Sequence, residues 1–167
     1  MPNKNLEKLI YKSYLKMIQN SEGSRIFNSF FVKDKTRGSE FDVYEDGVLS
    51  GAFYVSSVLS IFDLIDKPHS TTATIKSTLE NKKEKDWGWK DVKDNKLKPG
   101  DVLFWEELEF PDGFKSDQIG FYIDKDTAYS AGSSERQIIK HHPSFGVNAD
   151  GTLVRKIVAA YRHNFEN

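Results

Sequence analysis

The sequence contains no cysteine among its 167 residues. The lack of thiols excludes disulfides, thiolate metal sites and a cysteine nucleophile in this chain. It does not indicate a compartment, because a chain without thiols is compatible with oxidising and reducing surroundings alike. Any chemistry proposed for this protein therefore has to use other side chains.

One-sided charge and long apolar runs are also lacking. The 24 basic and 25 acidic residues are mixed along the chain and give a formal net charge of −1, so no basic block indicates nucleic acid. The most apolar segment, residues 48–65, is interrupted by four serines and Asp63, which favours a buried helix over a membrane span. We expect neither a nucleic-acid partner nor a membrane segment.

The first residues, 1–8, lack the apolar core and small-residue cleavage site of a secretory signal. This favours a cytoplasmic location, although removal of a leader would leave secretion open. Hydrophobic residues make up 38% of the chain and aromatic residues 13%, enough for a folded core. The length predicts one domain, residues 1–167.

Helical patterns occupy the first half of the chain. A helix is expected from Asn3 or Asn5 to about Gln19, within residues 1–20, and the apolar helix is expected to begin near Val48. A more exposed helix should carry Ile75 and Leu79, with Ser70 or a neighbouring threonine as its N-cap, and should end within residues 81–85. Between the first two helices, residues 25–32 indicate a short strand or an extended arm.

Short strands follow in the second half. They are predicted at residues 102–105, 118–123, 127–130, 137–142 and 153–161, with a hairpin turn at residues 124–126. Helices followed by antiparallel strands are typical of the α+β class.

Three motifs occur in a recognisable order: Leu49-Ser50-Gly51-Ala52-Phe53-Tyr54-Val55, then Pro99-Gly100-Asp101-Val102-Leu103-Phe104-Trp105, then Gln118-Ile119-Gly120-Phe121-Tyr122-Ile123. This order resembles the NlpC-type papain-like cysteine peptidases, bacterial cell-wall enzymes that cleave peptide bonds in murein. The similarity covers about residues 46–142, and the N-terminal helix lies outside it. The resemblance implies a papain-like α+β fold at about residues 46–163. In that fold a central buried helix packs on an antiparallel sheet of five or six strands.

The same resemblance places the family's nucleophile, base and orienting residue on Gly51, Gln118 and Ser130. Gly51 has no side chain, and Gln118 cannot move a proton near neutral pH. Ser130 can still hold Gln118 by a hydrogen bond. The resemblance therefore implies a catalytically degenerate member, a pseudoenzyme that binds a peptide, a murein fragment or a protein partner without cleaving it. Its ligand-binding residues would be Ser50, Gly51, Ala52, Trp105, Gln118, Ser130 and His142.

Alternatives stay open at this point. Gly51 could be a glycine that close packing requires at a helix start. A hydrolase or transferase could use other residues of the cleft, such as Asp101 with His69 or His142. His141 and His142 are adjacent on a predicted strand and point to opposite faces, so one of them would face the cleft.

Metal and cofactor sites are not expected. The four histidines are scattered without His-x-x-x-His spacing, and phosphate-binding loops and dinucleotide fingerprints are absent from the sequence. The aromatic side chains of Trp87, Trp89, Phe104, Trp105 and Tyr122 could line a groove, but aromatic residues in a helix–sheet domain are more often core.

Overall fold

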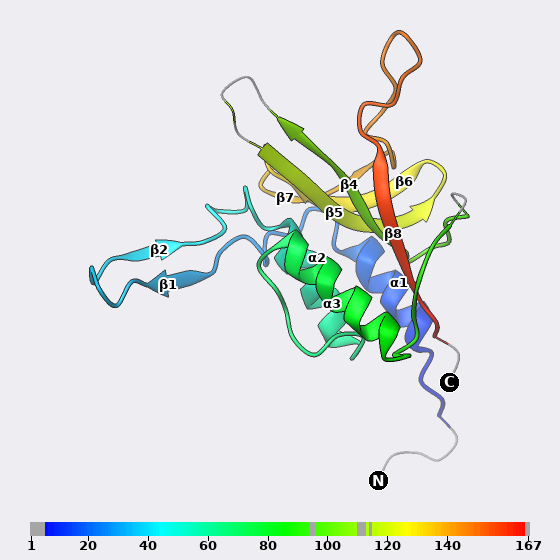
Figure 1. The fold of residues 1–167 in the computed structure, drawn as a ribbon, viewed down its shortest axis with the longest axis horizontal. Coiled ribbons are helices and arrows are strands. Elements are labelled where there is room, and N and C mark those ends of the chain that lie inside the picture. Colours follow the sequence, from blue (N-terminus) through cyan, green and yellow to red (C-terminus); the bar gives the residue numbers. More distant parts are fainter. Residues whose placement is uncertain (1–5, 94–95, 110–112, 114, 166–167) are drawn as a thin grey trace.

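The computed structural model describes residues 6–93, 96–109, 113 and 115–165. Its elements in chain order are α1 (Ile10–Asn20), β1 (Phe31–Lys33), β2 (Glu40–Asp42), α2 (Gly51–Ile61), α3 (Thr72–Glu84), β3 (Trp89–Asp91), β4 (Val102–Glu109), β5 (Lys115–Asp124), β6 (Thr127–Gly132), β7 (Gln137–His141) and β8 (Ile157–His163). Within the described residues they form an antiparallel sheet of six strands in the order β3-β8-β4-β5-β6-β7, and β1 pairs with β2 in a separate hairpin (Figure 1). The α+β class is as predicted.

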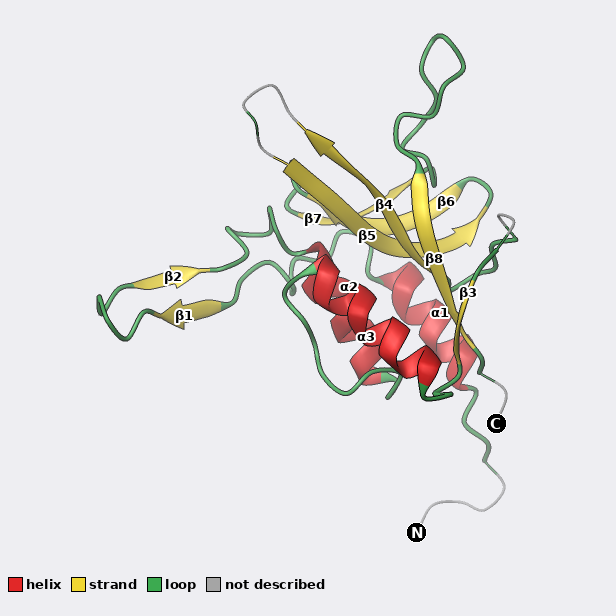
Figure 2. Ribbon diagram, viewed as in Figure 1, coloured by secondary structure: helices red, strands yellow, loops and turns green. Residues whose placement is uncertain are grey.

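The three helices of the described chain lie together on one side of the large sheet (Figure 2). α2 is the central one, and it is apolar or small on nearly every side, as a buried helix must be. Its residues from Ala52 to Leu59 are buried except Phe53. Tyr54 makes an edge-to-face contact with Phe121 of β5, at 5.6 Å between ring centroids. The apolar stretch in the sequence therefore forms the core helix that its composition predicts.

The opposite face of the sheet has a smaller core, centred on Leu103, Trp105, Ala128 and Ala160. The indole Nε1 of Trp105 donates a hydrogen bond to the carbonyl of Pro143 at 2.6 Å. This bond secures the segment between β7 and β8 against that face. Both faces of the central strands are thus covered, which explains why β4 begins with four consecutive buried residues.

The turn before β4 joins helix α1 to the sheet. Gly100 adopts a φ of +87°, a left-handed conformation that glycine tolerates best. The Tyr14 hydroxyl donates to the Gly100 carbonyl at 2.8 Å. The carboxylate of Asp101, 1% exposed, accepts from Nε and Nη2 of Arg162 at 2.8 and 2.7 Å and from the Lys98 N–H at 2.8 Å. We call Asp101, Arg162 and the Lys98 N–H the turn network.

Several predicted boundaries were wrong. α1 begins at Ile10 without a side-chain cap, and the caps expected at Asn3 and Asn5 lie outside the described residues. Of the expected arm, residues 25–32, only Phe31 and Val32 lie in a strand, β1, which pairs with β2 in a hairpin that extends away from the body (Figure 1). α2 is shorter than the apolar run, because the chain turns at Asp63, where φ is +57°.

The strands also differ from prediction. β3 was not predicted, and β4 and β5 extend beyond the strands predicted at residues 102–105 and 118–123. The last strand begins at Ile157, since residues 153–156 form irregular structure in which Arg155 donates to the Glu106 carbonyl. The hairpin turn at residues 124–126 and the N-cap of α3, Thr71, are confirmed.

Most of the aromatic residues considered as groove-lining candidates belong to the core, the alternative that the sequence favoured. Trp89, Phe104 and Trp105 are buried. Trp87 is half exposed, and the Lys82 ammonium lies 3.3 Å from the centroid of its ring. In the part of the chain that the structure describes, none of the helices combines the length and apolar character needed to cross a bilayer.

Candidate functional site

The start of α2 is held by the turn that precedes it. Gly47 has a φ of +97°, and a Cβ on it would lie 2.6 Å from the side chain of Asn28, so the turn requires glycine. The Ser50 hydroxyl, which is buried, donates to the Gly47 carbonyl at 3.0 Å. These contacts fix where the first turn of α2 points.

Gly51 begins α2 at the position to which the resemblance assigns a nucleophile. Its φ is not left-handed, so the backbone alone does not demand glycine. A Cβ built there would lie 3.2 Å from Oε1 of Gln118, which is tighter than ordinary contact. The absence of a side chain at Gly51 is therefore matched to the close approach of Gln118 from β5.

Gln118 is held by two acceptors on β6. Its Nε2 donates to Oγ of Ser130 at 3.1 Å and to the carbonyl of Ala131 at 2.7 Å. The hydrogen bond between Gln118 and Ser130 is as predicted. β5 and β6 can approach closely here because Gly120 on β5 lacks a side chain: a Cβ at that position would overlap the carbonyl oxygen of Tyr129 on β6.

His141 extends this chain of hydrogen bonds. Its Nδ1 lies 2.8 Å from the carbonyl oxygen of His142; a carbonyl only accepts, so Nδ1 carries the proton. Nε2 is then an acceptor, and the Ser130 hydroxyl, 2.9 Å away, donates to it. Burial lowers the pKa of His141, which favours this neutral form. We call Gln118, Ser130 and His141 the amide relay.

The amide relay lies on the sheet face that carries Trp105. Trp105 lies directly opposite Gln118 in the register of β4 and β5. Because side chains alternate between the two faces of a sheet, the strand registers place Ser130 and His141 on the same face as Trp105. The ring centroid of Trp105 lies 5.6 Å from that of His141. The ring of Phe145 stacks on the His141 imidazole, with 4.0 Å between centroids. Both rings therefore pack against the His141 end of the relay.

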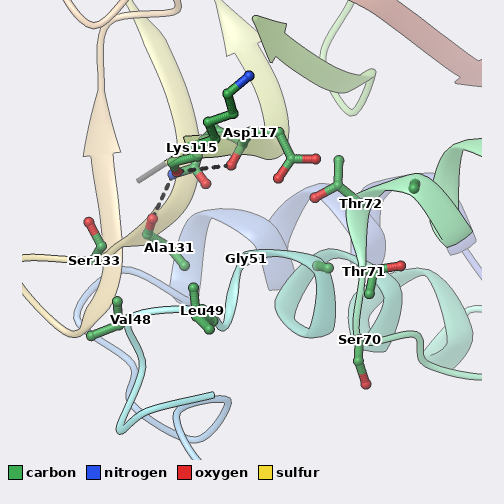
Figure 3. Close-up of a pocket in the computed structure, with 14 residues that line it drawn as sticks. Val48, Leu49, Gly51, Ser70, Thr71, Thr72, Lys115, Asp117, Ala131 and Ser133 are labelled. Atoms are coloured by element: carbon green, nitrogen blue, oxygen red, sulfur yellow. Dashed lines mark hydrogen bonds between the residues drawn. The ribbon is translucent and has the colours of Figure 1, made fainter. Parts of the chain in front are cut away.

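A cavity of about 260 Å³ opens beside Gly51 (Figure 3). It lies where the first turns of α2 and α3 face strand β5. The residues that line it are Val48, Leu49, Gly51, Ala52, Ser70, Thr71, Thr72, Ala73, Lys115, Ser116, Asp117, Gln118, Ala131 and Ser133. Hydroxyl, amide and small apolar groups make up most of this lining.

The two charged side chains of the cavity point differently. The carboxylate of Asp117 extends toward Thr72 at the start of α3, and the ammonium of Lys115 points away from Gly51 (Figure 3). Lys115 lies 3.4 Å from a carboxylate oxygen of Glu107 and 3.6 Å from one of Glu109. Its charge is therefore engaged outside the cavity.

The structure brings some predicted site residues together and separates others. Gly51, Ala52 and Gln118 line the cavity, while Ser50 and Ser130 are buried next to it. Trp105 is buried beside Gln118 and His141 and lies outside the cavity lining. His142 follows β7, is exposed, and pairs with the Ser144 hydroxyl at 2.8 Å, outside the cavity lining.

Sequence reasoning left open which of His141 and His142 faces the cleft and placed His142 among the binding residues. It missed Asp117 and the hydroxyls of residues 70–72. His141 could be chosen over His142 only with the register of β6 and β7, which sequence does not supply. Asp117 directly precedes Gln118, the base position of the third motif, and this adjacency could have indicated that Asp117 lies at the site. The hydroxyl run was interpreted only as a helix cap.

The alternative pairs for a different hydrolase do not form. Asp101 is engaged by Arg162, Nε2 of His69 lies 3.2 Å from the Thr78 hydroxyl, and His142 pairs with Ser144. Ser130 and His141 form a hydroxyl–imidazole pair, but Ser130 is fully buried and cannot reach a substrate. Among the described residues, no group of three His, Asp or Glu side chains is arranged to hold a metal ion.

No protein-family model matches the chain, and no curated protein is significantly similar to it in sequence.

Proposed function

We propose that this protein is a catalytically inactive member of the NlpC-type peptidase fold that binds a peptide, such as a murein stem peptide, in the cavity beside Gly51. One observation carries the proposal. The three positions to which the motifs assign nucleophile, base and orienting residue lie side by side: the Cβ position of Gly51 is 3.2 Å from Gln118 Oε1, and Gln118 Nε2 is 3.1 Å from Ser130 Oγ.

The same contacts argue against catalysis. A covalent mechanism needs a nucleophile at the helix start and a base beside it. Gly51 supplies no side-chain atom, and the amide of Gln118 neither gains nor loses a proton near neutral pH, so it cannot act as the base. The imidazole of His141 lies behind the buried Ser130, so Ser130 separates it from Gln118 and the cavity.

The cavity suits a short peptide segment. A volume of about 260 Å³ holds a group of one or two residues, less than most drug-sized ligands occupy. Its lining combines hydroxyl and amide groups with the small side chains of Gly51, Ala52, Ala73 and Ala131. Such a surface offers hydrogen bonds to a peptide backbone without an apolar pocket for a large side chain.

Calorimetric titration with murein stem peptides and muropeptides tests this proposal. Binding in the micromolar to millimolar range is expected for the wild type. Ala73→Leu should abolish it, because the exposed Ala73 lines the cavity at the first turn of α3. Ser77→Leu is the matched control, since Ser77 is exposed on the same helix and outside the lining. Absence of heat with the wild type at millimolar peptide would overturn peptide binding.

A further inference from the structure

The orientation of the Gln118 amide determines what the inner wall of the cavity offers to a ligand. The amide atom that lies 2.7 Å from the Ala131 carbonyl oxygen must be the nitrogen, because two acceptors cannot sit at that distance. The second proton of the same nitrogen goes to Ser130. Oε1 is then the edge that faces Gly51, so this wall presents an acceptor.

The rim of the cavity, like its inner wall, presents hydrogen-bond acceptors. The carboxylate of Asp117 is exposed, and within the described residues it has no ion pair or hydrogen bond. Lys115 is engaged by Glu107 and Glu109. Arg155 acts on Asp117 only at longer range, because its Nε and Nη2 donate to the carbonyls of Glu106 and Ser116. The negative charge at the rim is left without a close counter-charge.

The starts of α2 and α3 have the opposite preference: the N-terminus of a helix favours an anion, whereas Asp117 and Gln118 Oε1 favour a cation. Part of that capacity is already used at α3, where the Thr71 hydroxyl accepts from the Thr74 N–H at 3.2 Å. An anion in the cavity would also face the like charge of Asp117 and the lone pairs of Gln118 Oε1. A cation with N–H donors would gain from both, and charge-assisted hydrogen bonds are stronger than the contribution of a helix end.

We propose that the cavity binds a primary ammonium group carried by a peptide, with Asp117 as its counter-charge and Gln118 Oε1 as its acceptor. Ser130 and His141 act as positioning residues that hold the amide in this orientation. The inference rests on the proposed peptide-binding function and specifies its ligand. The ammonium group could belong to a peptide N-terminus or to a lysine-type side chain.

Four small probes separate these possibilities by calorimetry. Alanyl-alanine amide carries an N-terminal ammonium group, N-acetyl-lysine amide carries a side-chain ammonium group, N-acetyl-alanyl-alanine amide is neutral, and N-acetyl-alanyl-alanine carries a carboxylate. We expect at least one ammonium probe to bind roughly three- to tenfold more tightly than the neutral probe. The carboxylate probe should bind most weakly. The stronger ammonium probe identifies the source of the group.

Asp117→Asn should reduce the affinity for the ammonium probe to that of the neutral probe, with little effect on the neutral probe itself. Asp126→Asn is the matched control, because Asp126 is an exposed aspartate in the turn between β5 and β6, away from the cavity lining. Tightest binding of the carboxylate probe, or an unchanged ammonium affinity in Asp117→Asn, would overturn the inference and leave peptide binding standing. Failure of all four probes and of the stem peptides would overturn both.

Discussion

The turn network and the amide relay each join one buried polar side chain, Asp101 or Ser130, to partly buried side chains. They differ in how much of their hydrogen-bonding capacity is used inside the protein. In the turn network both oxygens of the Asp101 carboxylate are engaged by Arg162, and one also accepts from Lys98 N–H. In the amide relay Gln118 uses both N–H donors inside the protein and keeps its oxygen toward the cavity. A polar side chain held by internal hydrogen bonds therefore indicates a binding site only when some of its hydrogen-bonding capacity points to open space.

The largest effect is expected at the closed turn network. Arg162→Met leaves the carboxylate of Asp101, 1% exposed, without its cation, and should lower the free energy of unfolding by about 3–5 kcal/mol. Urea denaturation measures this loss. Arg37→Met is the control, because Arg37 forms only an exposed pair with Asp34 at 3.9 Å, and its effect should stay below about 0.5 kcal/mol. Ammonium binding should be unaltered in both variants; a loss specific to Arg162→Met would contradict the separation of the two networks.

A smaller loss of stability, together with a loss of binding, is expected in the amide relay. Ser130→Ala removes the partner of Gln118 Nε2 and of His141 Nε2, which should cost about 1–3 kcal/mol of unfolding free energy. The Gln118 amide is then less firmly oriented, so affinity for the ammonium probe should fall as well. Ser77→Ala, at an exposed position of α3, should change neither quantity. Unchanged binding in Ser130→Ala would show that the relay does not position Gln118.

Restoring the chemistry of the resembled family tests the geometry at Gly51 directly. In Gly51→Cys with Gln118→His the new thiol would adjoin an imidazole at the start of a helix, and its pKa should fall below the value of about 8.5 for free cysteine. Because the chain has no other cysteine, the pH dependence of alkylation reports this thiol alone. Ser77→Cys supplies an exposed reference thiol. Equal titration of the two thiols would contradict the alignment of the helix start.

The smallest effect is expected from pH. Burial lowers the pKa of His141 and of His163 below the ordinary value of 6.5. Below that value the unfolded chain binds more protons than the folded one, so stability should fall as pH is lowered from about 7 to about 5. His141→Gln and His163→Gln should each reduce this dependence. Only His141→Gln should also weaken ammonium binding, since His163 lies beside Trp89 and outside the relay.

The sequence predicted elements whose evidence is local. The apolar run around α2, the β5–β6 turn and the cap of α3 each depend on neighbouring residues. The start of α2 was expected near Val48 and lies at Gly51. β3 was missed because Trp89–Asp91 becomes a strand only by pairing with β8, far along the chain. The choice between His141 and His142 could not be made for the same reason, because it depends on the register between β6 and β7. The convergence of Gly51, Gln118 and Ser130 was expected from motif order, whereas the Asp117 carboxylate and the cavity required coordinates.

The position of β8 affects how the chain can fold during its synthesis. β8 lies between β3 and β4 and pairs with both, so β3 has no partner in the large sheet until residues 157–163 have left the ribosome. Arg162 belongs to the same strand, and until it arrives the carboxylate of Asp101 must stay in water, which opposes burial of the turn before β4. The helices and the β4–β7 meander can assemble earlier from contacts nearer in sequence. Completion of the sheet, not formation of the helices, should therefore be the late event in biosynthesis.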